Sequence, residues 1–148
     1  MIKVKRIDHV AIAVGDRDGA TRQLGEIFGL CDGAREHVAA QDVDVAFLHA
    51  DATTTAADTA LEVIAPAAPD GNPGLRKFLD RRGPGLHHIC FEVDDLPGAL
   101  ASLKAAGVRL IDDAPRPGAR GHLVAFLHPA STGGILFELC ATPHGAKA

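Results

Sequence analysis

The chain has 148 residues, a net charge of −4 and a hydrophobic content of 47%, enough for one domain or for two small halves that share a core. No long basic run occurs and no stretch approaches the roughly 18 apolar residues of a membrane span, which argues against binding to nucleic acid or membrane. The start, MIKVKRIDHV, lacks an apolar signal-peptide core, and the three cysteines include no CxxC motif. We therefore expect a cytoplasmic protein.

The first half of the chain predicts a strand, a helix and then further strands. Residues 6–14 (RIDHVAIAV) are β-branched and apolar, which is typical of a strand. Residues 17–28 place their apolar side chains on one helical face, with Asp16 as the expected N-cap and Gly29 as the expected stop. Two strand-bearing segments follow, at 35–50 and at 60–65.

The second half repeats this plan after a connecting segment. A Pro/Gly-rich stretch at 66–73 precedes a short predicted helix at 74–82. A helix over 97–106 is capped by Asp94 or Asp95 and carries Pro97 in its first turn, where a missing donor does no harm. The predicted strands of this half lie at 86–93, 108–111, 122–128 and 135–140.

An internal duplication explains why the two halves share one plan. The sequence VAFLH occurs at 45–49 and again at 124–128, an offset of 79 residues that also relates His9 to His88. After these segments the offset shrinks to 76 and relates Glu62 to Glu138.

The duplication predicts the fold class and the organisation of the chain. We expect an α+β protein in which two tandem βαβββ modules form a curved, partly open mixed sheet around a metal cleft. The predicted organisation is a single domain over 1–148, with module one at about 5–66, a connector at about 67–84 and module two at about 85–142.

One histidine and one glutamate from each half are candidate metal ligands. Glu62 and Glu138 lie inside the apolar strands ALEVIA and ILFELC, where an unpaired charge is costly and a metal would be a suitable partner. A pseudo-twofold axis would bring His9 beside His88 and Glu62 beside Glu138. Two imidazoles and two carboxylates suit Co²⁺, Ni²⁺, Mn²⁺, Fe²⁺ or Zn²⁺.

Strand alternation adds further side chains to the same faces. Cys90 and Glu92 share the face of His88, and Cys140 shares the face of Glu138. The cysteines are interpreted as small buried side chains, two of which line the cleft.

Several stretches carry a resemblance to a known family. They read IDHVAIAV at 7–14, GLHHI at 85–89, EVDD at 92–95, PRPGARG at 115–121, AFLHP at 125–129 and GGILFEL at 133–139. In these stretches the chain resembles the glyoxalase/vicinal-oxygen-chelate superfamily, and within it the methylmalonyl-CoA epimerases. The resemblance covers about residues 6–141.

The resemblance implies a reaction, a cofactor and partners. His9, Glu62, His88 and Glu138 match the family's metal ligands, with Co²⁺ as the first choice and Ni²⁺, Mn²⁺ or Zn²⁺ as alternatives. The implied activity is that of an isomerase that interconverts (2R)- and (2S)-methylmalonyl-CoA by removing the C2 proton through a metal-chelated enolate. Glu138 would be both a ligand and an acid–base group. The implied partners are an acyl-CoA substrate and a second copy of the chain in a homodimer.

The chain departs from the family at the second acid–base group. Some members carry a glutamate where this chain has Val45, which cannot move a proton. Glu92 is the candidate catalytic base in its place, with water or Glu62 as the alternative. Asn72 and Ala130 stand where epimerases often have Ser and Lys, which bears on the contacts to CoA.

Three other functions fit the same pattern in part. Bacterial glyoxalase I, a lactoylglutathione lyase, uses the same two-His, two-Glu ligand set, but the tail at 125–139 and the loop at 115–121 favour an epimerase. A non-catalytic small-molecule-binding protein of the superfamily would need none of the four ligands. An extradiol-type dioxygenase uses two His and one carboxylate, and a fourth strong ligand would leave too little room for substrate and O₂.

Overall fold

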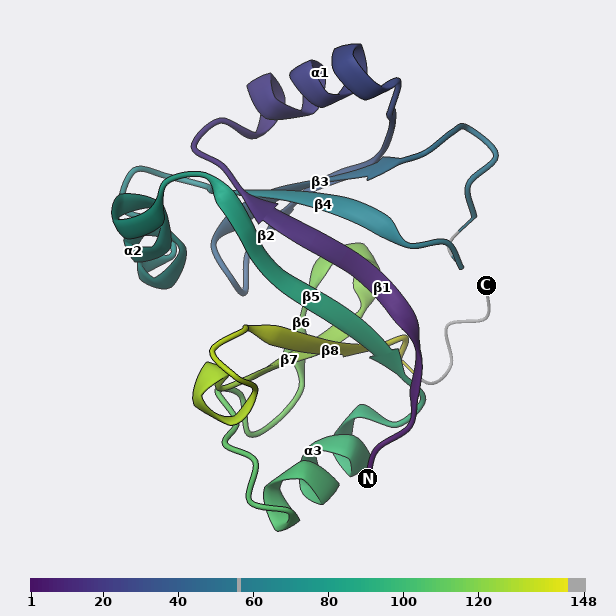
Figure 1. The fold of residues 1–148 in the computed structure, drawn as a ribbon, viewed down its shortest axis with the longest axis vertical. Helices are drawn as coiled ribbons and strands as arrows, with labels where there is room; N and C mark the ends of the chain where they lie inside the picture. The colour runs from purple at the N-terminus through teal and green to yellow at the C-terminus, as the bar shows by residue number, and fades with distance from the viewer. Residues whose placement is uncertain (56, 144–148) are drawn as a thin grey trace. The chain divides into compact units, whose positions relative to one another are not determined.

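The computed structural model describes residues 1–55 and 57–143 (Figure 1). The chain divides into two compact units, each considered by itself below. The N-terminal unit is His9–His87, and the C-terminal unit is Met1–Asp8 together with the described residues from His88 onward. Strand β1 (Val4–Ala13) and strand β5 (Gly85–Val93) each begin in one unit and end in the other.

The N-terminal unit contains a mixed sheet and two helices. Its sheet order is β2-β3-β4-β1, in which β1 runs parallel to β4, and β3 runs antiparallel to both of its neighbours. Helix α1 packs against β3 and β4 (Figure 1). The elements after β1 are α1 (Arg17–Phe28), β2 (Cys31–Val38), β3 (Val43–His49), β4 (Ala60–Pro66) and α2 (Pro73–Arg82).

Polar side chains and a glycine set the ends of these helices. The Asp16 carboxylate accepts a hydrogen bond from the Gly19 amide at 3.0 Å, and Gly29 ends α1 with a left-handed φ of 69°. Both predicted caps of α1 are confirmed. Asn72 caps α2 by accepting from the Leu75 amide at 2.9 Å.

The C-terminal unit has the same arrangement of strands. Its sheet order is β5-β8-β7-β6, in which β5 runs parallel to β8, and β7 runs antiparallel to β8 and β6. Helix α3 packs against β7 and β8, and the Asp95 carboxylate caps it by accepting from the Gly98 amide at 3.0 Å. The elements after β5 are α3 (Leu96–Ala105), β6 (Arg116–Pro117), β7 (Leu123–Leu127) and β8 (Phe137–Ala141), with short 3-10 turns at Ala119–Gly121 and Pro129–Ser131.

The strand pairing shows that the two modules are copies. In the N-terminal unit Glu62 lies opposite Ala11 across the parallel pair β1 and β4. In the C-terminal unit Glu138 lies opposite Cys90 across the parallel pair β5 and β8. The glutamates therefore occupy equivalent places, and the predicted α+β class built from two βαβββ modules is confirmed.

The predicted strand at 108–111 is wrong except for a single bridge between Leu110 and Leu127. Two backbone hydrogen bonds flank this bridge, from the His128 amide to the Arg109 carbonyl and from the Ile111 amide to the Phe126 carbonyl, both at 2.9 Å. The ladder does not continue, because the Asp112 carboxylate accepts from the Phe126 amide at 2.8 Å. The two-residue β6 forms further along, and its Pro117 has no N–H to donate to a longer ladder. Among the described residues, no helix is both long enough and apolar enough to cross a bilayer.

Candidate metal-binding and catalytic site

The N-terminal unit holds a buried histidine–glutamate pair. His9 Nε2 lies 3.2 Å from Glu62 Oε2, and the two residues are 4% and 5% exposed. The His9 ring packs edge-to-face on Phe47, with ring centroids 5.7 Å apart and planes 79° apart. Phe47 is in turn the cross-strand partner of Glu62 between β3 and β4. Phe47 thus packs on the imidazole of His9 and lies directly opposite Glu62 on the neighbouring strand.

The C-terminal unit holds the equivalent pair. His88 Nε2 lies 3.6 Å from Glu138 Oε2, and these residues are 5% and 4% exposed. The His88 ring packs edge-to-face on Phe126, with centroids 5.1 Å apart and planes 86° apart. Phe126 is the cross-strand partner of Glu138 between β7 and β8. The duplicated sequence has therefore produced the same local environment twice.

The geometry within each pair suits a divalent ion. Two ligand atoms bound at about 2.1 Å to one ion lie roughly 3.0 Å apart in adjacent octahedral positions and roughly 3.4 Å apart in a tetrahedron. The observed nitrogen–oxygen distances of 3.2 and 3.6 Å are close to this range. Imidazole nitrogen and carboxylate oxygen are also donors that first-row divalent metals accept. Each pair could therefore supply two ligands with little movement.

Phe47 and Phe126 contact the two histidines and were not predicted from the sequence. Both lie at the third position of the repeated VAFLH segment, and each contacts the histidine of its own unit. The exact repetition of this segment was the available signal, because a strand that merely filled a core could vary its residues between the two copies.

Glu92, the candidate second base, is held by two cations within the C-terminal unit. Its Oε1 accepts from Lys5 Nζ at 3.0 Å, and its Oε2 accepts from Arg6 Nε at 2.7 Å. Burial by itself would raise the pKa of Glu92, but the hydrogen bonds from Lys5 and Arg6 outweigh it and lower the pKa below the usual value. A carboxylate held in this way is a weaker base than a free one.

Two buried thiols lie on the same strand faces as His88 and Glu138, as strand alternation predicts. Cys90 and Cys140 are 0% and 1% exposed. The neighbouring Cys90 thiol and the His122 imidazole lower the pKa of Cys140 to about 6, while burial raises the pKa of Cys90 well above its usual value.

The remaining positions from the family comparison have structural roles. Val45 is buried in β3, and Asn72 caps α2 while its amide donates to the Gln41 carbonyl at 2.7 Å. Ala130 lies in the 3-10 turn after β7, where its amide donates to His128 Nδ1 at 3.1 Å. His87 packs edge-to-face on Phe78, and burial lowers its pKa against an opposing effect of Glu62.

Comparison with known proteins identifies the family. A family model described as "Glyoxalase/Bleomycin resistance protein/Dioxygenase superfamily" matches residues 8–126. An ethylmalonyl-CoA/methylmalonyl-CoA epimerase of Cereibacter sphaeroides is 37% identical over 92% of this chain and 97% of its own length. The chain belongs to the methylmalonyl-CoA epimerase family of this superfamily. Epimerases are isomerases, so the chain belongs to a family of isomerases.

Two further comparisons extend this assignment. The uncharacterized protein YqjC of Bacillus subtilis is 39% identical over 93% of this chain and 92% of its own length. A solved structure of a methylmalonyl-CoA epimerase in complex with methylmalonyl-CoA and NH₄⁺ superposes with a TM-score of 0.86 at 31% identity, and covers 96% of this chain and 97% of the other. The epimerase family's fold thus extends over nearly the whole chain.

Proposed function

We propose that this chain is a metal-dependent epimerase that interconverts (2R)- and (2S)-methylmalonyl-CoA. Membership of the epimerase family supports epimerisation of an acyl-CoA, and the solved relative carries methylmalonyl-CoA. The observation that carries the proposal is the buried histidine–glutamate pair, which occurs once in each module with nearly the same geometry. The proposal includes the expectation that both modules act as a single domain.

The proposed metal ligands are His9, Glu62, His88 and Glu138, and the proposed ion is divalent, with Co²⁺ first and Ni²⁺, Mn²⁺ or Zn²⁺ as alternatives. The donor set and the nitrogen–oxygen distance within each pair fit such an ion. A divalent ion bound there would stabilise the negative charge that develops on the thioester oxygen as C2 loses its proton.

Glu138 is the proposed base on one face of the substrate. Its carboxylate is buried on β8, where water competes little for its lone pairs. The carboxylate would take the C2 proton, and a second group on the opposite face would deliver a proton to the same carbon. Glu92 is our candidate for that second group, and its role requires that Lys5 or Arg6 release it during turnover.

A solution assay tests the reaction directly. The metal-loaded protein is incubated with (2S)-methylmalonyl-CoA in D₂O, and the C2 proton and methyl signals are followed by NMR. We expect deuterium to enter C2 while the 2R form accumulates. Unchanged C2 signals with no 2R product would overturn the proposal.

Parallel substrates define the specificity. Ethylmalonyl-CoA tests whether the acyl pocket accepts one more methylene, as the name of the Cereibacter sphaeroides relative suggests. The hemithioacetal of methylglyoxal and glutathione tests the glyoxalase alternative. Conversion of the hemithioacetal without exchange at C2 of either acyl-CoA would assign the site to that alternative. Homodimer formation and a cytoplasmic location stay predictions, which light scattering and cell fractionation can test.

A further inference from the structure

Arg116 places a cation on the sheet face that carries the second histidine–glutamate pair. It lies opposite Val124 between β6 and β7, and Val124 shares its face with Phe126, two residues further along β7. Phe126 in turn lies opposite Glu138 on β8. Since directly opposite residues of neighbouring strands project to the same side of a sheet, Arg116 and Glu138 belong to one face of the C-terminal unit.

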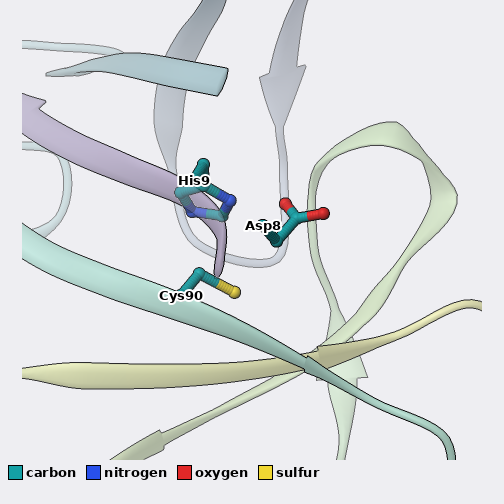
Figure 2. A group of neighbouring side chains, drawn as sticks. All are labelled: Asp8, His9 and Cys90. Atoms are coloured by element: carbon teal, nitrogen blue, oxygen red, sulfur yellow. The ribbon is translucent and has the colours of Figure 1, made fainter. Parts of the chain in front are cut away.

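The same face continues onto β5. Figure 2 shows the side chain of Cys90 on this strand, and Cys90 lies opposite Glu138 across the parallel pair. His88, two residues before Cys90, has the same parity and projects to the same side. The face therefore carries the histidine–glutamate pair on β5 and β8 and the guanidinium on β6.

Two contacts orient the guanidinium of Arg116. Its Cζ lies over the Phe126 ring, 5.5 Å from the centroid, and the same ring packs edge-to-face on His88. Its Nε lies 3.0 Å from Asp112 Oδ1, and the other oxygen of Asp112 accepts from the Phe126 amide at 2.8 Å. Phe126 thus contacts both the cation and the imidazole of the second pair.

The guanidinium keeps hydrogen-bond donors that the described part of the chain does not use. The ion pair with Asp112 does not align into a hydrogen bond, and neither Nε nor the two terminal nitrogens of Arg116 donate to residues 1–55 or 57–143. The side chain is 32% exposed, so a ligand can reach it from solvent. A guanidinium that rests on an aromatic ring with its terminal nitrogens unused can bind a carboxylate through two parallel hydrogen bonds.

The two modules differ at this place. Val45 of the repeated VAFLH segment is the equivalent of Val124, and its partner on β2 is Glu36. An ionised carboxylate accepts hydrogen bonds but has none to donate. The modules therefore share the histidine, the glutamate and the phenylalanine, but carry opposite charges at the equivalent positions of β2 and β6. Two similar histidine–glutamate pairs do not by themselves distinguish the two ends of a substrate, whereas a cation in one module does.

We propose that Arg116 recognises the free carboxylate of a malonyl-type acyl-CoA and thereby sets the orientation of the acyl group in the site. The inference rests on the proposed function only in taking an acyl-CoA as the ligand. The guanidinium favours the carboxylate over the neutral thioester, because hydrogen bonds between charged groups are roughly twice as strong as neutral ones. Removal of the C2 proton adds a second negative charge close to the carboxylate, which a neighbouring cation would stabilise.

Two matched ligands test this recognition without turnover. Malonyl-CoA carries a carboxylate where propionyl-CoA carries a methyl group, and neither has a stereocentre at C2. Their dissociation constants are measured by calorimetry with the full-length, Co²⁺-loaded protein, at equal metal content in every variant. We expect Arg116→Gln to weaken the binding of malonyl-CoA by about 10- to 100-fold and to leave that of propionyl-CoA unchanged. Arg116→Lys, which keeps the charge without the planar fork, should recover part of the preference.

Arg35→Gln is the matched control. Arg35 is 37% exposed and pairs with aspartates, as Arg116 does, but it lies opposite Ala46, which alternates with Val45 and faces the other side of its sheet. This variant should bind both ligands like the unmodified protein.

Three results would overturn the proposal. Equal weakening of both ligands by Arg116→Gln would assign the cation to a phosphate of CoA. Unchanged binding of both would leave Arg116 only its packing on Phe126, and an equal loss of preference in Arg35→Gln would show a general effect of surface charge. The readout does not depend on turnover. A protein that fails to exchange the C2 proton but loses its malonyl-CoA preference in Arg116→Gln would contradict the proposed function and support this inference.

Discussion

The imidazole of His9 and the carboxylate of Glu62 meet diagonally across two parallel strands. His9 lies opposite Ala60 and Glu62 lies opposite Ala11, yet the Nε2 and Oε2 atoms are 3.2 Å apart. Equivalent pairing places Glu138 opposite Cys90, two residues beyond His88. The strand register therefore brings the two side chains of each pair together, and metal binding should require little rearrangement within a module.

The two glutamates should respond differently to the same substitution. Glu138→Gln removes the proposed base and should lower the rate of C2 proton exchange by about 10²- to 10⁴-fold. Glu62→Gln keeps an oxygen ligand and leaves the proposed base in place, and should keep most of the exchange activity. The exchange rate in D₂O and the metal content of each purified variant measure the two effects.

Metal content makes this comparison decisive. If Glu138→Gln retains the ion but not the exchange, Glu138 acts as the base in addition to any role as a ligand. Equal losses of exchange in Glu138→Gln and Glu62→Gln, at equal metal content, would contradict the assignment of the base to Glu138.

The two phenylalanines should matter for the histidines they contact. Phe47→Leu and Phe126→Leu each remove an edge-to-face contact worth about 0.5 to 1.5 kcal/mol beyond the buried area. We expect a lower free energy of unfolding and, because the imidazole loses its support, a metal affinity lower by up to about tenfold. Denaturant unfolding and competition with a chelating dye measure these quantities.

Phe91→Leu is the matched control for the two phenylalanine variants. Its ring stacks on Phe137 in the C-terminal unit, with centroids 5.3 Å apart and planes 19° apart. This variant should lose stability without losing metal affinity. An equal loss of affinity in Phe91→Leu would show that the contacts with His9 and His88 have no particular role.

Much of this fold could be predicted because the chain repeats itself. The offset between His9 and His88 and the one between Glu62 and Glu138 indicated which residues are equivalent, and the strand register confirms the equivalence of the two glutamates. That the two pairs share one ion stays a prediction. Hydrophobic periodicity and the internal repeat can both be read directly from the sequence. They were sufficient to predict the order of strands and helices in each module.

Long-range polar contacts could not be predicted in this way. Asp8 has the opposite parity to its neighbour His9, so alternation gave no reason to bury it, yet it is 0% exposed. Its partner Arg120 lies 112 residues away, in a turn where Arg120 itself has a left-handed φ of 55°. The predicted strand at 108–111 is reduced to one bridge for a similar reason, since the Asp112 carboxylate accepts from the Phe126 amide where a longer ladder would continue.

Removing the buried carboxylate should be costly. Asp8→Asn leaves Arg6 and Arg120 near a neutral group, and loss of one partner of a buried ion pair typically costs about 3 to 5 kcal/mol. Chemical denaturation with a chelator present measures the loss without a contribution from bound metal. The control is Asp113→Asn, which breaks an exposed pair with Lys104 and should change stability by less than about 1 kcal/mol. Similar losses of stability in Asp8→Asn and Asp113→Asn would mean that the ion pairs of Asp8 contribute no more to stability than an exposed pair.

Glu92 should make stability depend on pH in the acid range. Its pKa in the folded protein lies below its ordinary value of 4.5, because Lys5 and Arg6 stabilise the carboxylate. As the pH falls below 4.5 the unfolded chain takes up the proton first, so the free energy of unfolding falls until the folded form is protonated as well. Glu92→Gln should therefore be less stable than the unmodified protein near neutral pH, and the difference should shrink as the pH falls through this window.

The control is Asp94→Asn, because the Asp94 side chain is 71% exposed, and this variant should follow the unmodified protein throughout. A constant difference between the Glu92→Gln variant and the unmodified protein from pH 7 to the acid limit would show that the ion pairs of Glu92 do not stabilise the fold, and would leave this carboxylate freer to act as a base.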